Sequence, residues 1–273
     1  MKKLLILSSI LILLTACSRD DLSSNLTEVI IQKYNNGIPS GIQHYYYSDG
    51  KINQITYYNS NSNFRVGYTK YGYYSNGSLL SIVNRDSNNR QVNAFEYIYD
   101  EYERLAFKKY TAETITESYY IDYTYNNDNT ITAKRMGNGE SLSMFYLNSD
   151  NIIYKETFNG EEYTVTYNGT NPTLATDGSN NRTFEYDELH NRLLLNDRNK
   201  DNLYLSNNIL MADNLFDGRN STADKYLIKE TAENGVISSI TKYDYIFNDI
   251  GLPTNRKEYL NDILVEEREY IYQ

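Results

Sequence analysis

The sequence predicts an all-β protein made of tandem antiparallel β-hairpins that together form one long, winding sheet or open shell. Three observations support this. Aromatic and β-branched residues alternate with polar ones, each alternation is followed by a cluster of Asn, Asp, Ser and Gly, and hardly any segment has helical periodicity. The chain of 273 residues contains 30 tyrosines and no tryptophan, and its prolines, Pro39, Pro172 and Pro253, all lie in expected turns or loops.

The alternation is clearest in the stretch 95–110, FEYIYDEYERLAFKKY. Phe95, Tyr97 and Tyr99 alternate with Glu96 and Ile98. A period of two places alternate side chains on opposite faces of a sheet, and aromatic and β-branched residues suit a pleated surface. We therefore expect a strand through residue 99, a turn over 100–103 and a return strand that begins near Leu105 and Phe107.

This unit is one copy of an internal repeat, which consists of an aromatic alternation, a polar turn and a short apolar return. The last aromatic residues before the turns lie mostly 19 to 27 residues apart and are predicted to be Tyr47, Tyr74, Tyr99, Tyr125, Tyr146, Tyr167, Tyr186 and Phe247. Several turns contain Asp-Gly or Asn-Gly, at 49–50, 76–77 and 168–169, which tolerate the positive φ of tight hairpins. The final residues, EREYIYQ, read as the opening strand of one more copy.

Three copies, YIYDEYERL, FEYDELHNRL and YIFNDIGLPT, resemble the YD repeats of Rhs-type proteins, whose pattern is Tyr-x-Tyr-Asp-x-x-Gly-Arg-Leu. Glu103 and Asn191 replace the glycine of that pattern, and only Arg104-Leu105 and Arg192-Leu193 keep the Arg-Leu pair. The resemblance covers most of residues 44–273 and implies a winding sheet of successive hairpins. Large Rhs proteins enclose a toxin in such a shell, and this chain is too short for that role to transfer.

The N-terminus has the features of an export signal. Lys2 and Lys3 precede an apolar run of about ten residues, too short to cross a bilayer, and a Leu-Thr-Ala-Cys string follows at 14–17. That string resembles the lipobox of bacterial lipoproteins, which implies cleavage before Cys17 and acylation of this only cysteine. We expect a signal peptide over 1–16, a lipidated tether over 17–26 and a repeat domain over 27–273. Ser18 at the second mature position favours an outer-membrane lipoprotein that faces the periplasm or the cell surface.

The net charge of the chain limits the classes of binding partner that we expect. Loss of Lys2 and Lys3 with the signal peptide lowers the formal net charge from −10 to −12, and no dense basic run is present. Nucleic acid is therefore excluded as an expected partner, because binding it needs clustered cations. The expected partners are the membrane, through the lipid anchor, and a protein or glycan of the cell envelope.

Candidate sites for chemistry are few. An irregular insertion at 196–224 contains Asp197, Asn199 and Asp201, which have the spacing that opens a calcium loop but lack its later ligands. His44 and His190 belong to no recognisable nucleophile or zinc motif. Neighbouring carboxylates such as Glu161-Glu162 and Glu266-Glu267 should point to opposite faces of a strand. The sequence predicts no cofactor, no metal site and no catalytic residue.

The tyrosines allow two interpretations. A ring with a polar tip suits a half-buried sheet layer, and it also suits a ligand surface. Because the copies carry tyrosine throughout, a packing role is favoured, and any specific site is expected in the irregular insertion. The sequence thus favours a membrane-anchored, non-catalytic binding or structural module with an unknown ligand. The alternative is a hydrolase of envelope components or glycans that uses dispersed carboxylates.

Overall fold

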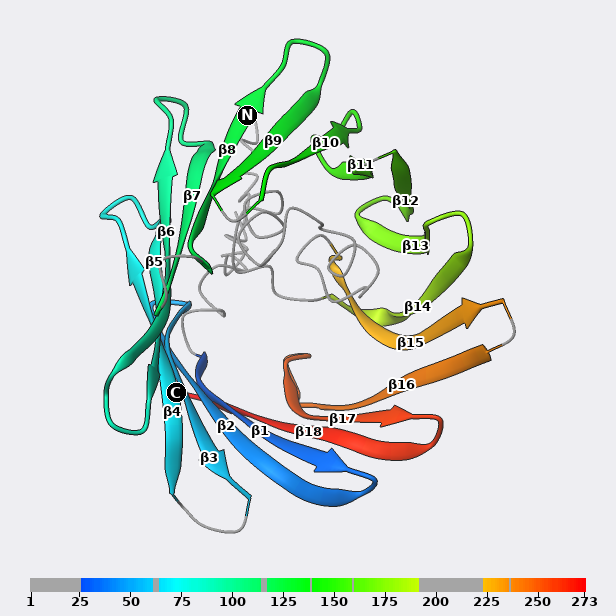
Figure 1. Cartoon of the computed structure of the whole chain (residues 1–273). Helices are drawn as coiled ribbons and strands as arrows, with labels where there is room; N and C mark the ends of the chain where they lie inside the picture. Colours follow the sequence, from blue (N-terminus) through cyan, green and yellow to red (C-terminus); the bar gives the residue numbers. More distant parts are fainter. Residues whose placement is uncertain are drawn as a thin grey trace, which may run out of the picture.

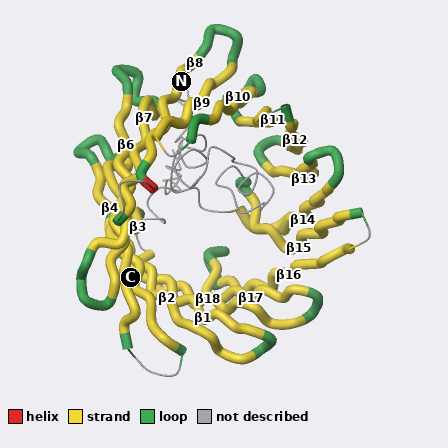
Figure 2. Tube along the Cα trace, in the orientation of Figure 1, coloured by secondary structure: helices red, strands yellow, loops and turns green. Residues whose placement is uncertain are grey.

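The computed structural model describes residues 26–60, 64–113, 117–137, 139–158, 160–191, 223–235 and 237–273. Strands, shown in yellow in Figure 2, make up nearly all of the regular structure in these ranges. In chain order they are β1 (Leu26–Asn35), β2 (Ile38–Ser48), β3 (Lys51–Asn59), β4 (Arg65–Tyr73), β5 (Leu79–Asp86), β6 (Gln91–Tyr99), β7 (Leu105–Ala112), β8 (Tyr119–Tyr125), β9 (Thr130–Gly137), β10 (Ser141–Leu147), β11 (Ile153–Phe158), β12 (Glu161–Asn168), β13 (Asn171–Thr176), β14 (Asn180–Asn191), β15 (Lys225–Asn234), β16 (Ile237–Phe247), β17 (Pro253–Leu260) and β18 (Ile263–Tyr272).

The 18 strands form one sheet, and that sheet is closed. Each strand pairs antiparallel with the next along the chain, and β18 returns to pair with β1, from Leu26 opposite Tyr272 to Lys33 opposite Glu266. The result is an up-and-down barrel, visible as a complete ring in Figure 1. The all-β hairpin prediction is confirmed, whereas the open shell is wrong. The reason is that the predicted opening strand at the C-terminus finds its return strand in β1, at the other end of the chain.

The two faces of the barrel wall differ in composition. Alternate residues converge on the concave side, where Tyr97, Leu105 and Ile121 are 1% exposed or less. An 18-stranded ring is too wide for side chains to meet across it, so these residues pack along the inner wall against their neighbours on adjacent strands. The outer wall carries cross-strand ion pairs, with Lys109 beside Glu96 at 3.6 Å and Lys229 beside Glu185 at 2.6 Å.

A β-bulge follows most hairpin turns and resets the alternation. In the β6–β7 hairpin Tyr99 pairs with Leu105 but Ile98 pairs with Phe107, so one extra residue lies on the return strand. Phe107 therefore points outward, and Lys108 takes the buried inner position opposite Tyr97. This differs from the simple alternation expected for the return strand.

The same bulge corrects one repeat position. Tyr73, not Tyr74, ends β4 at the bulge, whereas Tyr146 remains the last aromatic residue before its turn, with Leu147 ending β10. In these copies Tyr74 and Asn148 occupy the turn position that Asp100 holds in the clearest copy, since their amides bond to the carbonyls of Ser78 and Ile152 as that of Asp100 bonds to Arg104. The expected end of β4 is one residue late, because the two adjacent tyrosines Tyr73 and Tyr74 do not show in the sequence which of them ends the strand.

In the described part of the chain, five hydrogen bonds that we call tyrosine bridges join neighbouring hairpins. In each, the hydroxyl of the last tyrosine of an opening strand donates to a backbone carbonyl at the start of the preceding return strand, as Tyr99 does to Leu79 at 3.0 Å and Tyr125 to Leu105 at 3.1 Å. The others link Tyr73 to Ile52, Tyr167 to Ile153 and Tyr272 to Pro253. The β-ladder between the two strands stops two residues before that carbonyl, so the hydroxyl replaces the missing amide donor. The packing role expected for these repeat tyrosines is thus confirmed.

The turns explain the polar residues of the repeat. Asp100 Oδ1 accepts the amides of Tyr102 and Arg104 at 3.0 and 2.8 Å, which closes the turn. Glu103 has φ of 59°, the left-handed conformation for which the YD pattern uses glycine. Asn191, by contrast, ends β14 and pairs with Lys225, so this strand continues through the positions after Tyr186 where a turn was expected.

Other expectations fall on residues outside the described ranges. These are the signal peptide, Cys17 and the tether before residue 26, and the insertion at 196–224 except for Ala223 and Asp224, which lead into β15. Among the described residues, no helix has the length and apolar character needed to cross a membrane.

Candidate functional site

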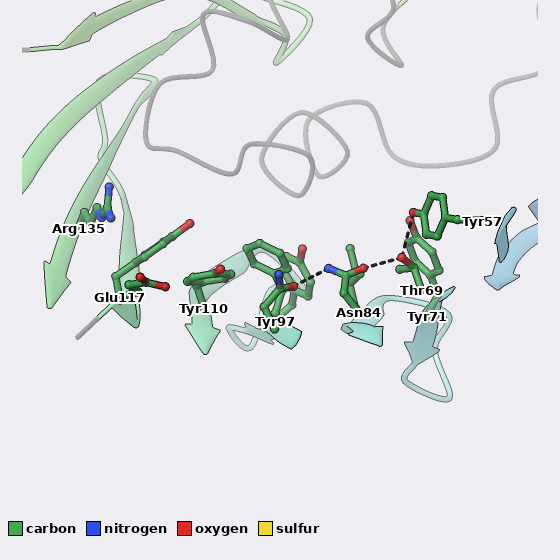
Figure 3. A pocket seen from close by; sticks show the side chains of 12 residues that line it. Tyr57, Thr69, Tyr71, Asn84, Tyr97, Tyr110, Glu117 and Arg135 are labelled. Carbon is green, nitrogen blue, oxygen red and sulfur yellow. Dashed lines mark hydrogen bonds between the residues drawn. The ribbon is translucent and has the colours of Figure 1, made fainter. Parts of the chain in front are cut away.

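A pocket of about 520 Å³ lies on the inner wall, where strands β3 to β9 run side by side. Figure 3 shows its side chains projecting from these strands toward the same side. Its size is within the range of pockets that hold small ligands, ~300–1,000 Å³. Three groups of side chains and Ile82 line it, and all but Glu117 come from the strands.

The amide end consists of Tyr57, Thr69, Asn84 and Asn93, one residue from each of four successive strands. The Thr69 hydroxyl donates to Asn84 Oδ1 at 2.5 Å, and Asn84 Nδ2 donates to Asn93 Oδ1 at 2.5 Å. The Tyr57 hydroxyl lies 3.0 Å from Thr69 Oγ1 and completes the row, dashed in Figure 3. No described residue accepts a hydrogen bond from Asn93 Nδ2, so the row ends in an open donor.

The aromatic floor consists of Tyr71, Phe95, Tyr97, Tyr110 and Tyr119. The ring of Tyr110 lies 4.9 Å from that of Phe95 and 4.9 Å from that of Tyr119, centroid to centroid. Burial raises the pKa of Tyr71 and Tyr97 well above the ordinary value of 10, so their hydroxyls stay neutral at physiological pH. The rings of Phe95, Tyr110 and Tyr119 therefore pack against one another along the wall, and the hydroxyls of Tyr71 and Tyr97 are uncharged.

The arginine end consists of Glu117 and Arg135 (Figure 3). The Arg135 guanidinium lies over the Tyr119 ring, 4.0 Å from its centroid, which holds the side chain by a cation–π contact. Its Nε is buried without a hydrogen-bond partner, and no described carboxylate forms an ion pair with it. A buried donor without a partner is uncommon in folded proteins and marks Arg135 as a candidate for contact with a ligand.

Lys108 lies beside this floor, on the same inner face and opposite Tyr97. Its ammonium is 4.9 Å from the Phe95 ring centroid and 5.9 Å from that of Tyr97, and burial lowers its pKa to about 7. Because the unfolded chain holds this proton up to about pH 10.5, protonated Lys108 costs folding stability below pH 7, and that cost disappears as the pH rises toward 10.5.

A second polar cluster on the inner wall lies at the β17–β18–β1 seam. Glu266 forms ion pairs with Lys33, Arg256 and Arg268, and Arg256 also contacts Glu258 at 2.8 Å. These cations hold the pKa of Glu266 at about 2. A glycosidase acid needs a raised pKa, so Glu266 does not have the pKa of such an acid.

Adjacent glutamates point to opposite faces of their strand, as expected. Glu266 is bound at the inner cluster, whereas Glu267 faces outward, with its carboxylate 3.7 Å from Lys257. Likewise Glu161 accepts a hydrogen bond from Tyr163 and Glu162 pairs with Lys155. The prediction that adjacent carboxylates do not share a face is confirmed for both pairs.

The histidines lie outside the pocket. His44 Nδ1 is 2.5 Å from Glu28, and His190 Nδ1 is 2.6 Å from Asp187, with its ring stacked on Phe247. In the described part of the chain, no three His, Cys, Asp or Glu residues are grouped to hold a metal ion. The weak calcium candidate Asp197, Asn199 and Asp201, and the lipidation site Cys17, lie beyond the described residues.

The sequence does not predict the pocket. A site is expected there in the irregular insertion at 196–224, whereas the pocket is lined by residues of the clearest repeat copies, including Phe95 and Tyr97. A usable signal was present. Thr69, Asn84 and Asn93 occupy inward strand positions where the repeat would place apolar side chains. Without the register between strands, nothing in the sequence shows that these positions are adjacent.

Comparison with known proteins gives structural similarity alone. No protein-family model matches the chain, and no curated protein matches it. Solved structures with a similar course of strands include a porin-like protein from Bacteroides uniformis (10% identity, 91% of this chain and 98% of that chain covered, TM-score 0.32). A porin-like protein from Bacteroides vulgatus shows 13% identity over 91% of this chain and 99% of that chain, with a TM-score of 0.43. The Tc holotoxin pore of Photorhabdus luminescens shows 13% identity and a TM-score of 0.31, covering 86% of this chain but 15% of the toxin chain.

Proposed function

We propose that the chain is a non-catalytic binding barrel, tethered to the outer membrane through lipid on Cys17, that holds a component of the cell envelope in its inner-wall pocket. The observation that carries this proposal is the pocket itself, with open polar groups at both ends of a rigid aromatic floor. Fixed rings and pre-positioned donors lower the entropic cost of binding.

The charged outer wall favours attachment to the membrane by a lipid tether over insertion of the barrel into the bilayer. Its strands carry exposed ion pairs such as Lys155 with Glu162 at 2.6 Å and Lys257 with Glu267 at 3.7 Å. A charged residue on the lipid-facing side of a barrel costs ~2–4 kcal/mol at the bilayer midplane. Such a wall is suited to water, and attachment to a membrane then requires a separate anchor.

The anchor has a direct test. Replacement of Cys17 by serine removes the thiol that receives the lipid, and the protein should move from the membrane fraction to the soluble extracytoplasmic fraction. Fractionation with immunoblotting measures this, and Ser18→Ala, which leaves the thiol, is the control. Retention of the Cys17→Ser protein in the membrane would contradict the anchor.

Binding at the pocket has its own test. Ligands of mixed chemistry (saccharides, peptides and small organic acids) are screened by the rise in Tm that binding produces. Asn84→Leu removes the centre of the hydrogen-bonded row and should abolish any rise seen with the native chain. Asn255→Leu makes the same change on the outer wall of β17 and should leave the rise intact. If both variants respond equally, the ligand binds elsewhere and the pocket is not the site.

A further inference from the structure

We propose that the barrel rests on the membrane through one of its two rims, where exposed apolar side chains contact lipids whose headgroups carry an ammonium group. This inference rests on the proposed lipid anchor at Cys17 and adds a second contact with the same membrane, made by the protein itself. It assigns that contact to three side chains, Tyr102, Leu189 and Ile250, which we call the apolar tips.

The strand order determines which segments share a rim. Neighbouring strands are antiparallel around the whole ring, so the ends of the even-numbered strands and the starts of the odd-numbered strands lie at one rim. We call it the turn rim, because it carries the turns closed by Asp100 and Asn248. β1 begins at this rim with Leu26, and β18 ends there with Tyr272, its partner in the ladder. The segment that joins Cys17 to the barrel therefore meets the barrel at the turn rim.

The length of the tether limits which rim reaches the membrane. The nine residues from 17 to 25 span at most ~30 Å, at about 3.5 Å per residue. β1 alone has 10 residues, which is roughly 33 Å at a rise of ~3.3 Å per residue. Contact through the opposite rim would require the tether to run nearly straight along the whole wall, whereas contact through the turn rim has no such requirement.

The apolar tips lie in segments that project from the turn rim. Tyr102 and Ile250 lie in the turns after β6 and β16, and Leu189 lies in the bulge at the end of β14. They are 69%, 63% and 84% exposed, although the Arg104 guanidinium lies over one face of the Tyr102 ring. Apolar side chains that project from one rim are suited to the boundary between headgroups and acyl chains.

The backbone holds each tip in place. Each is the second residue after an Asp or Asn whose Oδ1 accepts its amide, at 3.0 Å for Tyr102, 2.7 Å for Leu189 and 3.2 Å for Ile250. Because these bonds fix the projecting backbone before any contact is made, little further ordering is needed when the rim meets a surface.

Carboxylates beside the tips determine which lipid fits. Glu101, Glu188 and Asp249 directly precede the three tips, are exposed, and form no ion pair with any described residue. An anionic bilayer surface repels such groups. Choline and ethanolamine headgroups carry an outer ammonium group, with which a carboxylate can pair while the neighbouring apolar side chain reaches deeper. The charge of the turn rim therefore favours zwitterionic over anionic lipid.

This orientation places the inner-wall pocket on the side away from the membrane. Asn84 lies two residues before the end of β5, Asn93 two residues after the start of β6, and Arg135 two residues before the end of β9. All three positions are next to the opposite rim. A ligand therefore reaches the pocket from the aqueous side, and the lipid contact does not compete with it.

The test attaches an environment-sensitive fluorophore to one introduced cysteine at a time, on the full-length lipidated chain whose own Cys17 thiol is occupied by lipid. Leu189→Cys and Ile250→Cys report on the turn rim. Ile38→Cys and Phe64→Cys are the matched controls, because these side chains are apolar, 69% and 62% exposed, and lie at the opposite rim. On vesicles of phosphatidylcholine and phosphatidylethanolamine with spin-labelled lipid as quencher, the turn-rim probes should be quenched at least about threefold more than the controls, since an interfacial contact lies ~5–10 Å into the bilayer surface.

The choice of lipid has its own arm. Replacement of about a third of the lipid by phosphatidylglycerol should reduce quenching of the Leu189→Cys probe at least about twofold at low salt. The further changes Glu101→Gln, Glu188→Gln and Asp249→Asn should remove this sensitivity. The same changes at the opposite rim, Glu113→Gln, Glu140→Gln and Asp262→Asn, should leave it intact. Quenching that is unaffected by anionic lipid overturns the headgroup assignment.

The outcomes separate this inference from the anchor. Flotation of the protein with the vesicles reports the anchor, and equal quenching at the two rims of floating protein contradicts the rim contact while the anchor stands. A mature chain that carries no lipid on Cys17 by mass spectrometry and does not float removes the anchor, and this inference with it.

Discussion

Replacement of Glu266 by glutamine should destabilise the barrel by ~3–5 kcal/mol, the cost of breaking a buried ion pair by removal of one partner. The carboxylate is 2% exposed and neutralises Lys33, Arg256 and Arg268, which come from three adjacent strands at the closing seam. With glutamine these cations keep only Glu258, which contacts Arg256 alone. Denaturant unfolding followed by far-UV circular dichroism measures the loss.

Glu267→Gln is the matched control, since it makes the same change one residue later on the outer wall. Its ion pair with Lys257 spans 3.7 Å and is partly exposed, so the change should cost less than ~1 kcal/mol. Equal losses in the two variants would show that the inner cluster has no special role in closure.

The same carboxylate predicts how stability depends on pH. The pKa of Glu266 in the folded protein, about 2, lies below its ordinary value of 4.5. Its contribution, ~3 kcal/mol from the linkage relation, is therefore complete above about pH 4.5 and is lost as the pH falls toward 2. The difference in stability between native and Glu266→Gln proteins should shrink over this window.

Deletion of β18 should have the larger effect and prevent a stable monomer. The deletion removes the pairing of β18 with β1 and with β17. It also removes Glu266 and the tyrosine bridge from Tyr272 to Pro253. The strands β17 and β1 then become open edges, which pair readily with other chains. Light scattering after size-exclusion chromatography should show aggregates or oligomers in place of a monomer.

A circular permutant provides the control for that deletion. Residue 273 is joined to Leu26 by a short linker, which is feasible because Leu26 and Tyr272 are paired neighbours, and new termini are placed in the turn at 87–89. Every strand pair is kept, so the permutant should be a folded monomer. A monomeric deletion variant, or a permutant that aggregates, would show that pairing of β1 with β18 does not determine closure.

The repeat made much of this fold predictable. Alternation around Phe95, Tyr97 and Tyr99 identified strands, and Asp and Asn at the strand ends identified turns, because these side chains close the turn through their own oxygens. What alternation cannot show is an extra residue. The bulge after the turn of the β6–β7 hairpin reverses the faces of the return strand and places Lys108 inside and Phe107 outside.

Closure of the barrel and the position of the pocket could not be predicted from the sequence for a different reason. Closure depends on how curvature accumulates over all the hairpins until β18 meets β1, and no single copy contains that information. The pocket requires Thr69, Asn84 and Asn93 to lie side by side, which is set by register between strands and not by any local motif.

The seam also dictates an order of events during synthesis. Thr27 bonds to the carbonyl of Ile271, 244 residues away, so β1 has only β2 as a partner until the last strand has been made. Successive hairpins can form as the chain emerges, and tyrosine bridges can join several of them at that stage, whereas the ring cannot close. The nascent barrel therefore spends nearly its whole synthesis as an open ribbon with an unpaired first edge, the period in which a chaperone or a neighbouring chain has access to it.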